Sequence, residues 1–137
     1  MEQRDYLKKQ IDEFSQMLFT LITKLLQGKT AGTFNEDLQT TNKQLEEVLG
    51  YSFDDLTAIP DDDFVSTLKA KKIQNDGLDK LAELLLLAAD NEGTTEKGKQ
   101  FYKKSFFLFE KLESVENIYS MDRHRKIERI KKIINPN

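Results

Sequence analysis

The sequence predicts an all-α fold, a compact bundle of about six to seven helices, on three observations. Apolar residues recur at spacings of three and four over most of the chain, which is the period of one face of an α-helix. Capping residues, glycines and prolines divide this pattern into segments. No run alternates polar and apolar residues between turn signals, as a half-buried strand would. We expect one helical domain over residues 1–137, which is long enough to bury a core without disulfides.

The N-terminal segment predicts a long helix over residues 2–27. Its main apolar stripe alternates spacings of four and three and consists of Leu7, Ile11, Phe14, Leu18, Leu21 and Leu25. A second stripe beside it consists of Tyr6, Met17, Ile22 and Leu26. A face this broad exceeds the seam of a simple coiled coil. We expect Gly28 to end the helix, because glycine just past a helix end adopts the left-handed conformation without steric cost.

Capping signals predict three shorter helices within residues 28–73. The box Thr33–Glu36 opens a helix that Gly50 ends, and the box Ser52–Asp55 opens a short helix through Leu56. Pro60 suits the first position of the next helix, and the three aspartates that follow it suit a first turn, where the helix dipole favours anions. The residues expected to face inward are Phe34, Leu38, Leu45, Val48, Leu49, Phe64, Val65 and Leu68.

Three further helices are expected over about 75–90, 95–115 and 120–134. The first contains four consecutive leucines, Leu84–Leu87, and the second contains five aromatic rings in nine residues: Phe101, Tyr102, Phe106, Phe107 and Phe109. Each run covers more than one face of a helix. Such helices either lie at the centre of a bundle or leave apolar surface for a partner. The last helix has Ile127, Ile130 and Ile134 on one face.

The segment Leu78–Leu112 resembles a single tetratricopeptide helix pair. The residues that match the pattern are Leu81, Ala82, Leu85, Gly98, Tyr102, Lys103, Lys104, Ser105, Phe106 and Leu108. In that family small residues let two helix backbones approach and bulky residues fill the space beside them. Here the turn is about four residues longer than the family's, and Glu110 replaces the closing proline. The resemblance implies a C-terminal helical hairpin whose apolar face the N-terminal helices must cover, because one unit cannot bury it alone.

The whole chain is also similar to an uncharacterised family of short bacterial all-helical proteins, a domain of unknown function. The similar residues are the start Met1–Tyr6, together with Ala82, Tyr102, Lys103 and Lys104. That family has no assigned activity, so the resemblance implies a fold and no site.

The composition excludes several classes of protein. The chain has no cysteine, which excludes disulfides, thiolate metal sites and cysteine nucleophiles. The N-terminus lacks the basic start and the unbroken apolar region of a signal peptide. The apolar run Met17–Leu26 is interrupted by Lys24 and is shorter than the ~20 residues of a membrane-spanning helix. We therefore expect a cytoplasmic protein without membrane association.

Several motifs are too incomplete to predict chemistry. Gly28–Thr30 lacks the earlier glycine and the strand of a phosphate-binding loop. Asp90–Glu96 lacks the required glycine and glutamate positions of a calcium loop. The aspartates at 54–55 and 61–63 suit helix caps and first turns. The only histidine, His124, has one carboxylate four residues on, and a metal would need further ligands. We expect no enzyme activity, no cofactor and no metal site.

The segment Arg123–Asn137 is basic, with six basic residues and one acid for a net charge of +5, whereas the rest of the chain carries −8. The basic residues are Arg123, Arg125, Lys126, Arg129, Lys131 and Lys132. They could bind nucleic-acid phosphate or another polyanion, or lie on a membrane surface. They could instead form a solvated face, or pair with the acidic part of the same or another copy. No recognition motif accompanies them, which makes phosphate binding the weaker hypothesis.

The leading hypothesis for function is a non-enzymatic protein–protein interaction or scaffold module, self-association included. Its mechanism would be the burial of aromatic and aliphatic anchors between helices. The candidate partner-binding residues are Phe101, Tyr102, Phe106, Phe107 and Phe109. The alternative is a nucleic-acid or polyanion binder that uses the basic last helix. The sequence alone names no partner, oligomeric state or pathway.

Overall fold

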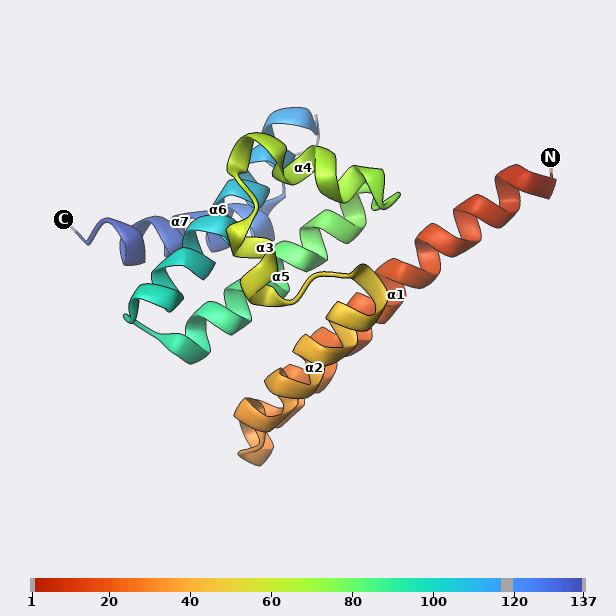
Figure 1. The fold of residues 1–137 in the computed structure, drawn as a ribbon. Coiled ribbons are helices and arrows are strands. Elements are labelled where there is room, and N and C mark those ends of the chain that lie inside the picture. Colours follow the sequence, from red (N-terminus) through yellow and green to blue (C-terminus); the bar gives the residue numbers. More distant parts are fainter. Residues whose placement is uncertain (1, 117–119, 137) are drawn as a thin grey trace.

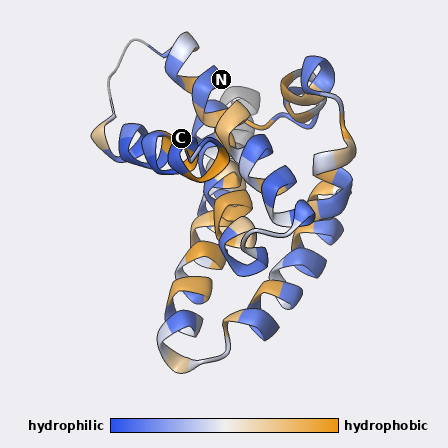
Figure 2. Ribbon diagram, turned by 90° about the vertical axis from the view of Figure 1, so that its left-hand side faces the viewer, coloured by the Kyte–Doolittle hydropathy of each residue, from blue (hydrophilic) through white to orange (hydrophobic). Residues whose placement is uncertain are grey.

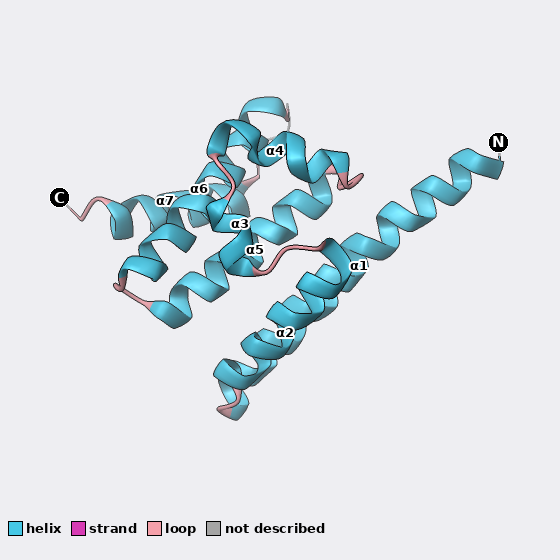
Figure 3. Ribbon diagram, viewed as in Figure 1, coloured by secondary structure: helices cyan, strands magenta, loops and turns pink. Residues whose placement is uncertain are grey.

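The structure is a computed structural model that describes residues 2–116 and 120–136, with side chains described from Glu13 onward. It confirms the predicted all-α bundle: the described residues form seven helices and no strand (Figures 1 and 3). The helices are α1 (Glu2–Ala31), α2 (Phe34–Leu49), α3 (Phe53–Ala58), α4 (Asp61–Ala70), α5 (Asn75–Glu92), α6 (Glu96–Val115) and α7 (Met121–Ile134).

The first two helices form an antiparallel hairpin, because only Gly32 and Thr33 connect them (Figure 1). At about 1.5 Å per residue, the 30-residue α1 is nearly twice as long as the 16-residue α2. The N-terminal part of α1 therefore extends beyond the other helices. Leu18, Leu21 and Leu25 of the predicted stripe are buried in the core.

The predicted end of the first helix at Gly28 is wrong, because α1 continues through Ala31. Gly32 has the left-handed conformation, with φ +82°, and the N–H of Thr33 donates to the carbonyl of Gly28 at 2.9 Å. This hydrogen bond, which closes a six-residue turn, is part of a Schellman motif. Gly28 instead allows a close approach, since a Cβ there would meet the carboxylate of Asp37. The capping box at Thr33 is also wrong: its hydroxyl donates to Asp37 Oδ2 at 2.8 Å and caps no backbone N–H.

Other predicted helix ends are confirmed to within one or two residues. Both hydrogen bonds of the Ser52–Asp55 box are present, at 3.1 and 3.0 Å. Gly50 ends α2 with φ +88°. Thr95 accepts from the N–H of Gly98 at 3.1 Å at the start of α6. Pro60 lies one residue before α4, at its N-cap. These side chains satisfy backbone N–H groups that a helix start otherwise leaves without partners.

The pair α5 and α6 forms the centre of the fold, with three residues between the two helices. α1 packs on α5, whereas α3, α4 and α7 pack on α6. Small residues lie at contacts between the two central helices and their connection. The hydroxyl of Ser105 donates to the carbonyl of Ala82 at 2.7 Å, and a Cβ on Gly98 would meet the carbonyl oxygen of Gly93. The hairpin that the sequence implies is therefore present.

All seven described helices contribute to one hydrophobic core. Hydrophobic and hydrophilic stretches alternate along the helices, as expected of helices with one buried side (Figure 2). α5 is the exception, since every residue of Leu84–Ala89 is buried. Full burial of one leucine contributes about 1.5–3 kcal/mol, so this run anchors the bundle. Within the described residues, no helix combines the length and the apolar character needed to cross a bilayer.

Candidate functional site

Three of the five candidate rings on α6 lie in the core. Phe109 is fully buried, and Phe101 and Tyr102 are only 3% and 5% exposed. The Phe101 ring packs edge-on against Phe53, with 6.2 Å between centroids. A partner therefore cannot reach Phe101, Tyr102 or Phe109 without unfolding the bundle, and these rings act in folding.

Tyr102 also holds α5, α6 and α7 together through a polar contact. Its hydroxyl donates to Asp90 Oδ1 at 2.6 Å, and Arg129 donates to both oxygens of Asp90 at 3.1 and 2.9 Å. Burial, followed by the hydrogen bond and the negative charge of Asp90, raises the pKa of Tyr102 to about 12. The phenol is thus a hydrogen-bond donor to a carboxylate at neutral pH, which is a structural role.

The remaining two rings, Phe106 and Phe107, are half-buried and line a groove of about 430 Å³. We call this space the α6 groove. It lies between the start of α4, the outer side of α6 and the end of α7. Its lining residues are Asp61, Lys103, Phe106, Phe107, Glu110, Lys131, Ile134 and Asn135. The volume is within the roughly 300–1,000 Å³ range of ligand sites.

Residues of the core pack against the floor of the α6 groove. The Phe107 ring lies 6.4 Å from the ring of the fully buried Phe64. The ammonium of Lys104 lies 4.6 Å from the Phe64 centroid and donates to Asp61 at 2.7 Å and to the carbonyl of Ile59. A cation over an aromatic face is favourable by about 0.5–2 kcal/mol. These contacts support the Phe107 ring from the side of the core.

The rim of the α6 groove carries charges of both signs. Lys103 and Glu110 are exposed and make no ion pair within the described part of the chain. Lys131 is paired with Glu128 at 3.4 Å. An apolar floor with a polar rim is the usual composition of a protein interface.

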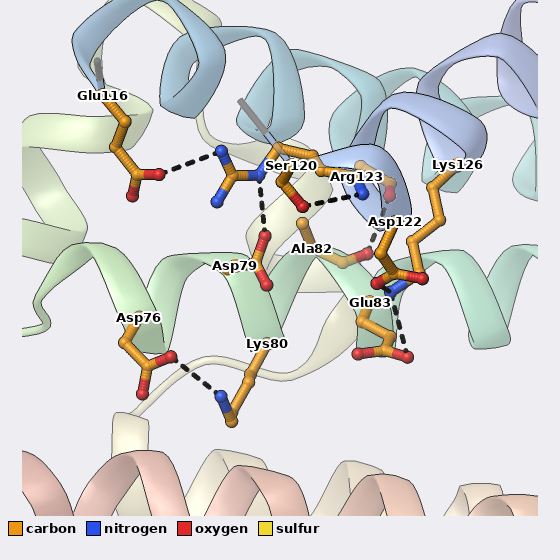
Figure 4. Close-up of polar contacts among 11 residues, drawn as sticks. Asp76, Asp79, Lys80, Ala82, Glu83, Glu116, Ser120, Asp122, Arg123 and Lys126 are labelled. Carbon is orange, nitrogen blue, oxygen red and sulfur yellow. Dashed lines mark hydrogen bonds and ion pairs between the residues drawn. The ribbon is translucent and has the colours of Figure 1, made fainter. Parts of the chain in front are cut away.

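The basic residues of α7 mostly pair with carboxylates of the same chain. Arg123 is buried and donates to Asp79 and Glu116, each at 3.0 Å, while Ser120 caps its backbone N–H (Figure 4). Burial lowers the pKa of Arg123, but the hydrogen bonds and the negative charges of Asp79 and Glu116 together outweigh it and raise that pKa. This guanidinium therefore joins α7 to α5 and to the end of α6.

Two more cations of α7 reach the same side of α5. Lys126 lies 3.3 Å from Glu83 and 2.8 Å from Asp122 (Figure 4), and Arg129 pairs with Asp90. Burial lowers the pKa of Lys126, but its carboxylate partners raise it by more. Of the six candidate polyanion-binding residues, only Arg125 and Lys132 are exposed without an ion pair among the described residues. The sequence left pairing with acids of the same chain as one alternative, but it could not name the partners on α5, which lie about 40 residues away.

No metal site is formed by the residues that the structure describes, since they contain no suitable group of three or more His, Asp or Glu side chains. His124 Nε2 lies 3.9 Å from Glu128 Oε1 on the surface of α7. Gly28–Thr30, the remnant of a phosphate-loop pattern, lies within the last turn of α1. These positions provide no converging set of reactive groups.

Two sets of lining residues were not predicted from the sequence. Ile134 was predicted to share one face of α7 with Ile127 and Ile130; it is half-buried, packs against the core and also lines the α6 groove. A second, polar pocket is formed by amide side chains of α2 and α5, among them Asn35 and Asn91. Single amides on helix surfaces give no sequence signal, and only the fold brings them together.

Comparisons with models of protein families, with curated proteins and with solved structures find no match for this chain. The resemblance to a tetratricopeptide pair and that to the uncharacterised bacterial family stay predictions.

Proposed function

We propose that this chain is a non-enzymatic protein-interaction module that binds a partner through the α6 groove. The observation that carries the proposal is the pair of half-buried rings, Phe106 and Phe107, beside Ile134 on a fixed floor. The occupant is a protein segment that places an apolar side chain between these rings and its own polar groups against the rim. Binding by aromatic and aliphatic anchors in a groove follows the usual energetics of interfaces, where a few central residues dominate.

The groove is favoured over the other exposed apolar residues because it gathers several of them. The large exposed side chains elsewhere are Phe19 and Leu26 on α1, Val48 on α2, and Val115 and Met121 near the α6–α7 connection. Val48 lines a groove of about 440 Å³ between α1 and α2, but no aromatic ring lines that groove. Scattered single residues are normal on a protein surface and indicate no interface. The rings of the α6 groove instead adjoin one another and an isoleucine.

The alternative, a polyanion binder that uses α7, has less support. Four of its six cations have carboxylate partners, and Arg123 is buried. A phosphate would have to displace these intramolecular partners. The pairing instead supports the view that the basic helix neutralises the acidic side of α5.

Photo-crosslinking tests the proposal even while the partner is unidentified. A photoreactive phenylalanine replaces Phe106 in the full chain, in cells that express the protein natively. Phe19, which is 60% exposed on α1, is replaced in the control variant. We expect a discrete adduct from position 106 that the control does not form.

The mass of the adduct identifies the class of partner. A product of twice the chain mass means self-association through the groove, and a different defined mass means another protein. The adduct from position 106 must disappear when Phe107→Asp is added, provided that circular dichroism shows this variant to be folded. Equal labelling from positions 106 and 19, or no adduct from either, would overturn the proposal.

A further inference from the structure

Another concave site among the described residues is a polar pocket of about 180 Å³ where α2, α3, α5 and α6 meet. It is separate from the α6 groove and shares no lining residue with it. Its floor is apolar and consists of the buried residues Leu38, Phe53, Ala88 and Phe101. Its walls are polar and consist of Asn35, Gln39, Asn42, Asp54, Asn91, Glu92 and Lys97.

The four carboxamides of the wall keep unused hydrogen-bonding capacity. Asn91 donates to Asn35 Oδ1 at 3.3 Å, and Asn42 Oδ1 accepts from the N–H of Phe53 at 2.8 Å. The NH₂ groups of Asn35 and Asn42 donate to no group in the described part of the chain, and Gln39 makes no hydrogen bond there. Each carboxamide offers two donors and an acceptor. Donors and acceptors from two helices therefore surround the same small space.

Charges of both signs complete the pocket. Lys97 at the start of α6 lies 3.5 Å from Asp54 of α3, and its ammonium lies 5.8 Å from the Phe101 centroid. Glu92 at the end of α5 is half-buried and makes no ion pair among the described residues. An exposed lysine that pairs with α3 and a half-buried carboxylate that has no ion pair among the described residues thus line the same space.

The size and the polarity of the pocket limit its ligand. A volume of about 180 Å³ is far above the roughly 10–15 Å³ that one water molecule needs, and below the roughly 300–1,000 Å³ of sites for drug-sized molecules. An apolar ligand would desolvate the amides without hydrogen-bonding them, which is unfavourable. A phosphate is disfavoured because the carboxylates of Asp54 and Glu92 would repel it. A divalent ion is disfavoured because no group of three or more metal-binding side chains exists among the described residues.

We propose that this pocket binds a small zwitterion of the size and charge of an α-amino acid. The ammonium group of the ligand pairs with Glu92, and its carboxylate accepts from Lys97 and from the NH₂ groups of Asn42 and Gln39. Its side chain covers the floor formed by Phe53 and Phe101. This binding is independent of the α6 groove, so either proposal can fail alone.

The test is isothermal titration calorimetry of the full chain with each of the twenty common α-amino acids. We expect saturable binding of at least one of them. Its methyl ester and its N-acetyl derivative, which each remove one charge, should bind at least about tenfold more weakly, or about 1.4 kcal/mol. Two pocket variants, Gln39→Ala and Lys97→Met, should show a similar loss.

Matched controls separate binding in the pocket from effects on folding. Gln44→Ala removes an exposed amide of the same helix α2, and Lys99→Met removes an exposed lysine of the same helix α6. Both should bind as the wild type does. The proposal is overturned if no amino acid binds, or if the blocked derivatives bind equally well. It is also overturned if the pocket variants retain full affinity, or if neutral glucose binds and Lys97→Met does not weaken it, since that would assign the pocket to polyols.

Discussion

The side chain of Arg123 joins three helices, although in the sequence it is one of six similar cations. It is buried, and its two carboxylate partners come from α5 and from the end of α6. Removing one member of such a network leaves charges without partners in a partly desolvated place, which costs more than the contact itself contributes. The same residue type two positions later, Arg125, is exposed. Burial, and not residue type, separates their roles.

Arg123→Met should lower the free energy of unfolding by about 2–3 kcal/mol. Methionine keeps much of the aliphatic volume, so the loss reports the missing charge and hydrogen bonds. Arg125→Met should change stability by less than about 0.5 kcal/mol. Urea denaturation of both variants measures the difference. Equal stabilities of the two variants would contradict the structural role of Arg123.

The raised pKa of Tyr102 predicts that the folded protein loses stability at alkaline pH. Below pH 10.0 the phenol is neutral in both the folded and the unfolded chain, so it adds no pH dependence. Above that value the unfolded chain ionises first, because the folded pKa is raised to about 12. The free energy of unfolding then falls, by up to about 2.7 kcal/mol once the pH exceeds the folded pKa, because the folded and unfolded pKa values differ by about two.

Denaturation of the wild type and of Tyr102→Phe between pH 8 and pH 12 checks this expectation. The wild type should lose more stability above pH 10 than the variant, because phenylalanine has no proton to lose. Parallel curves for the two proteins would show that Tyr102 titrates normally and that its bond to Asp90 is not maintained in solution.

At the scale of the elements, the starts of helices were predicted better than their ends. Ser52 caps its helix as predicted, and Thr95 and Ser120 cap helices at the predicted starts, because a capping hydroxyl acts on a backbone N–H only three residues away. The end of α1 was misassigned because Gly28 and Gly32 both fit a helix terminus locally. The left-handed terminus lies at Gly32, with φ +82°, whereas Gly28 stays within the helix beside Asp37 of the next helix. Such tertiary contacts are not encoded in the local pattern.

Gly98 controls how closely α5 and α6 approach. Gly98→Ala places a methyl group against the backbone carbonyl of Gly93, and a backbone atom cannot rotate away as a side chain could. We expect a loss of about 1–3 kcal/mol. Lys99→Ala, one residue later and exposed, should change stability by less than about 0.5 kcal/mol. Thermal unfolding of the two variants measures the contrast, and a stabilised Gly98→Ala protein would mean that the hairpin is looser than described.

At the scale of the whole molecule, the sequence predicted the helical class but not which apolar residues remain accessible. α6 has rings on several sides, so its pattern defines no unique inward face. The positions of α3, α4 and α7 decide that Phe101 and Phe109 are buried while Phe106 and Phe107 line the groove. The pairing of α7 with α5 likewise depends on the fold. Counting charges in the sequence gave the net charge of each segment, but it could not show which acid pairs with which cation.

The internal pairing of α7 predicts a weak dependence of polyanion binding on salt. Two cations, Arg125 and Lys132, are exposed without an ion pair among the described residues. Duplex DNA bound through two phosphate contacts gives a slope of about −1.8 in log K against log salt. Titration of duplex DNA into the protein at several salt concentrations should therefore show weak binding, with a slope of log K against log salt no steeper than about −2. A slope near −5 would mean that the paired cations exchange their carboxylates for phosphates.

The decisive measurement of binding in the α6 groove is the affinity of the captured partner for the protein and its variants. The protein captured from position 106 is titrated against the wild type, Phe106→Ala and the control Phe19→Ala. Truncation of a central anchor costs more than about 1.4 kcal/mol, or tenfold in affinity. We predict at least that loss for Phe106→Ala in folded protein and unchanged affinity for Phe19→Ala. Equal affinity of the wild type and Phe106→Ala would contradict the account.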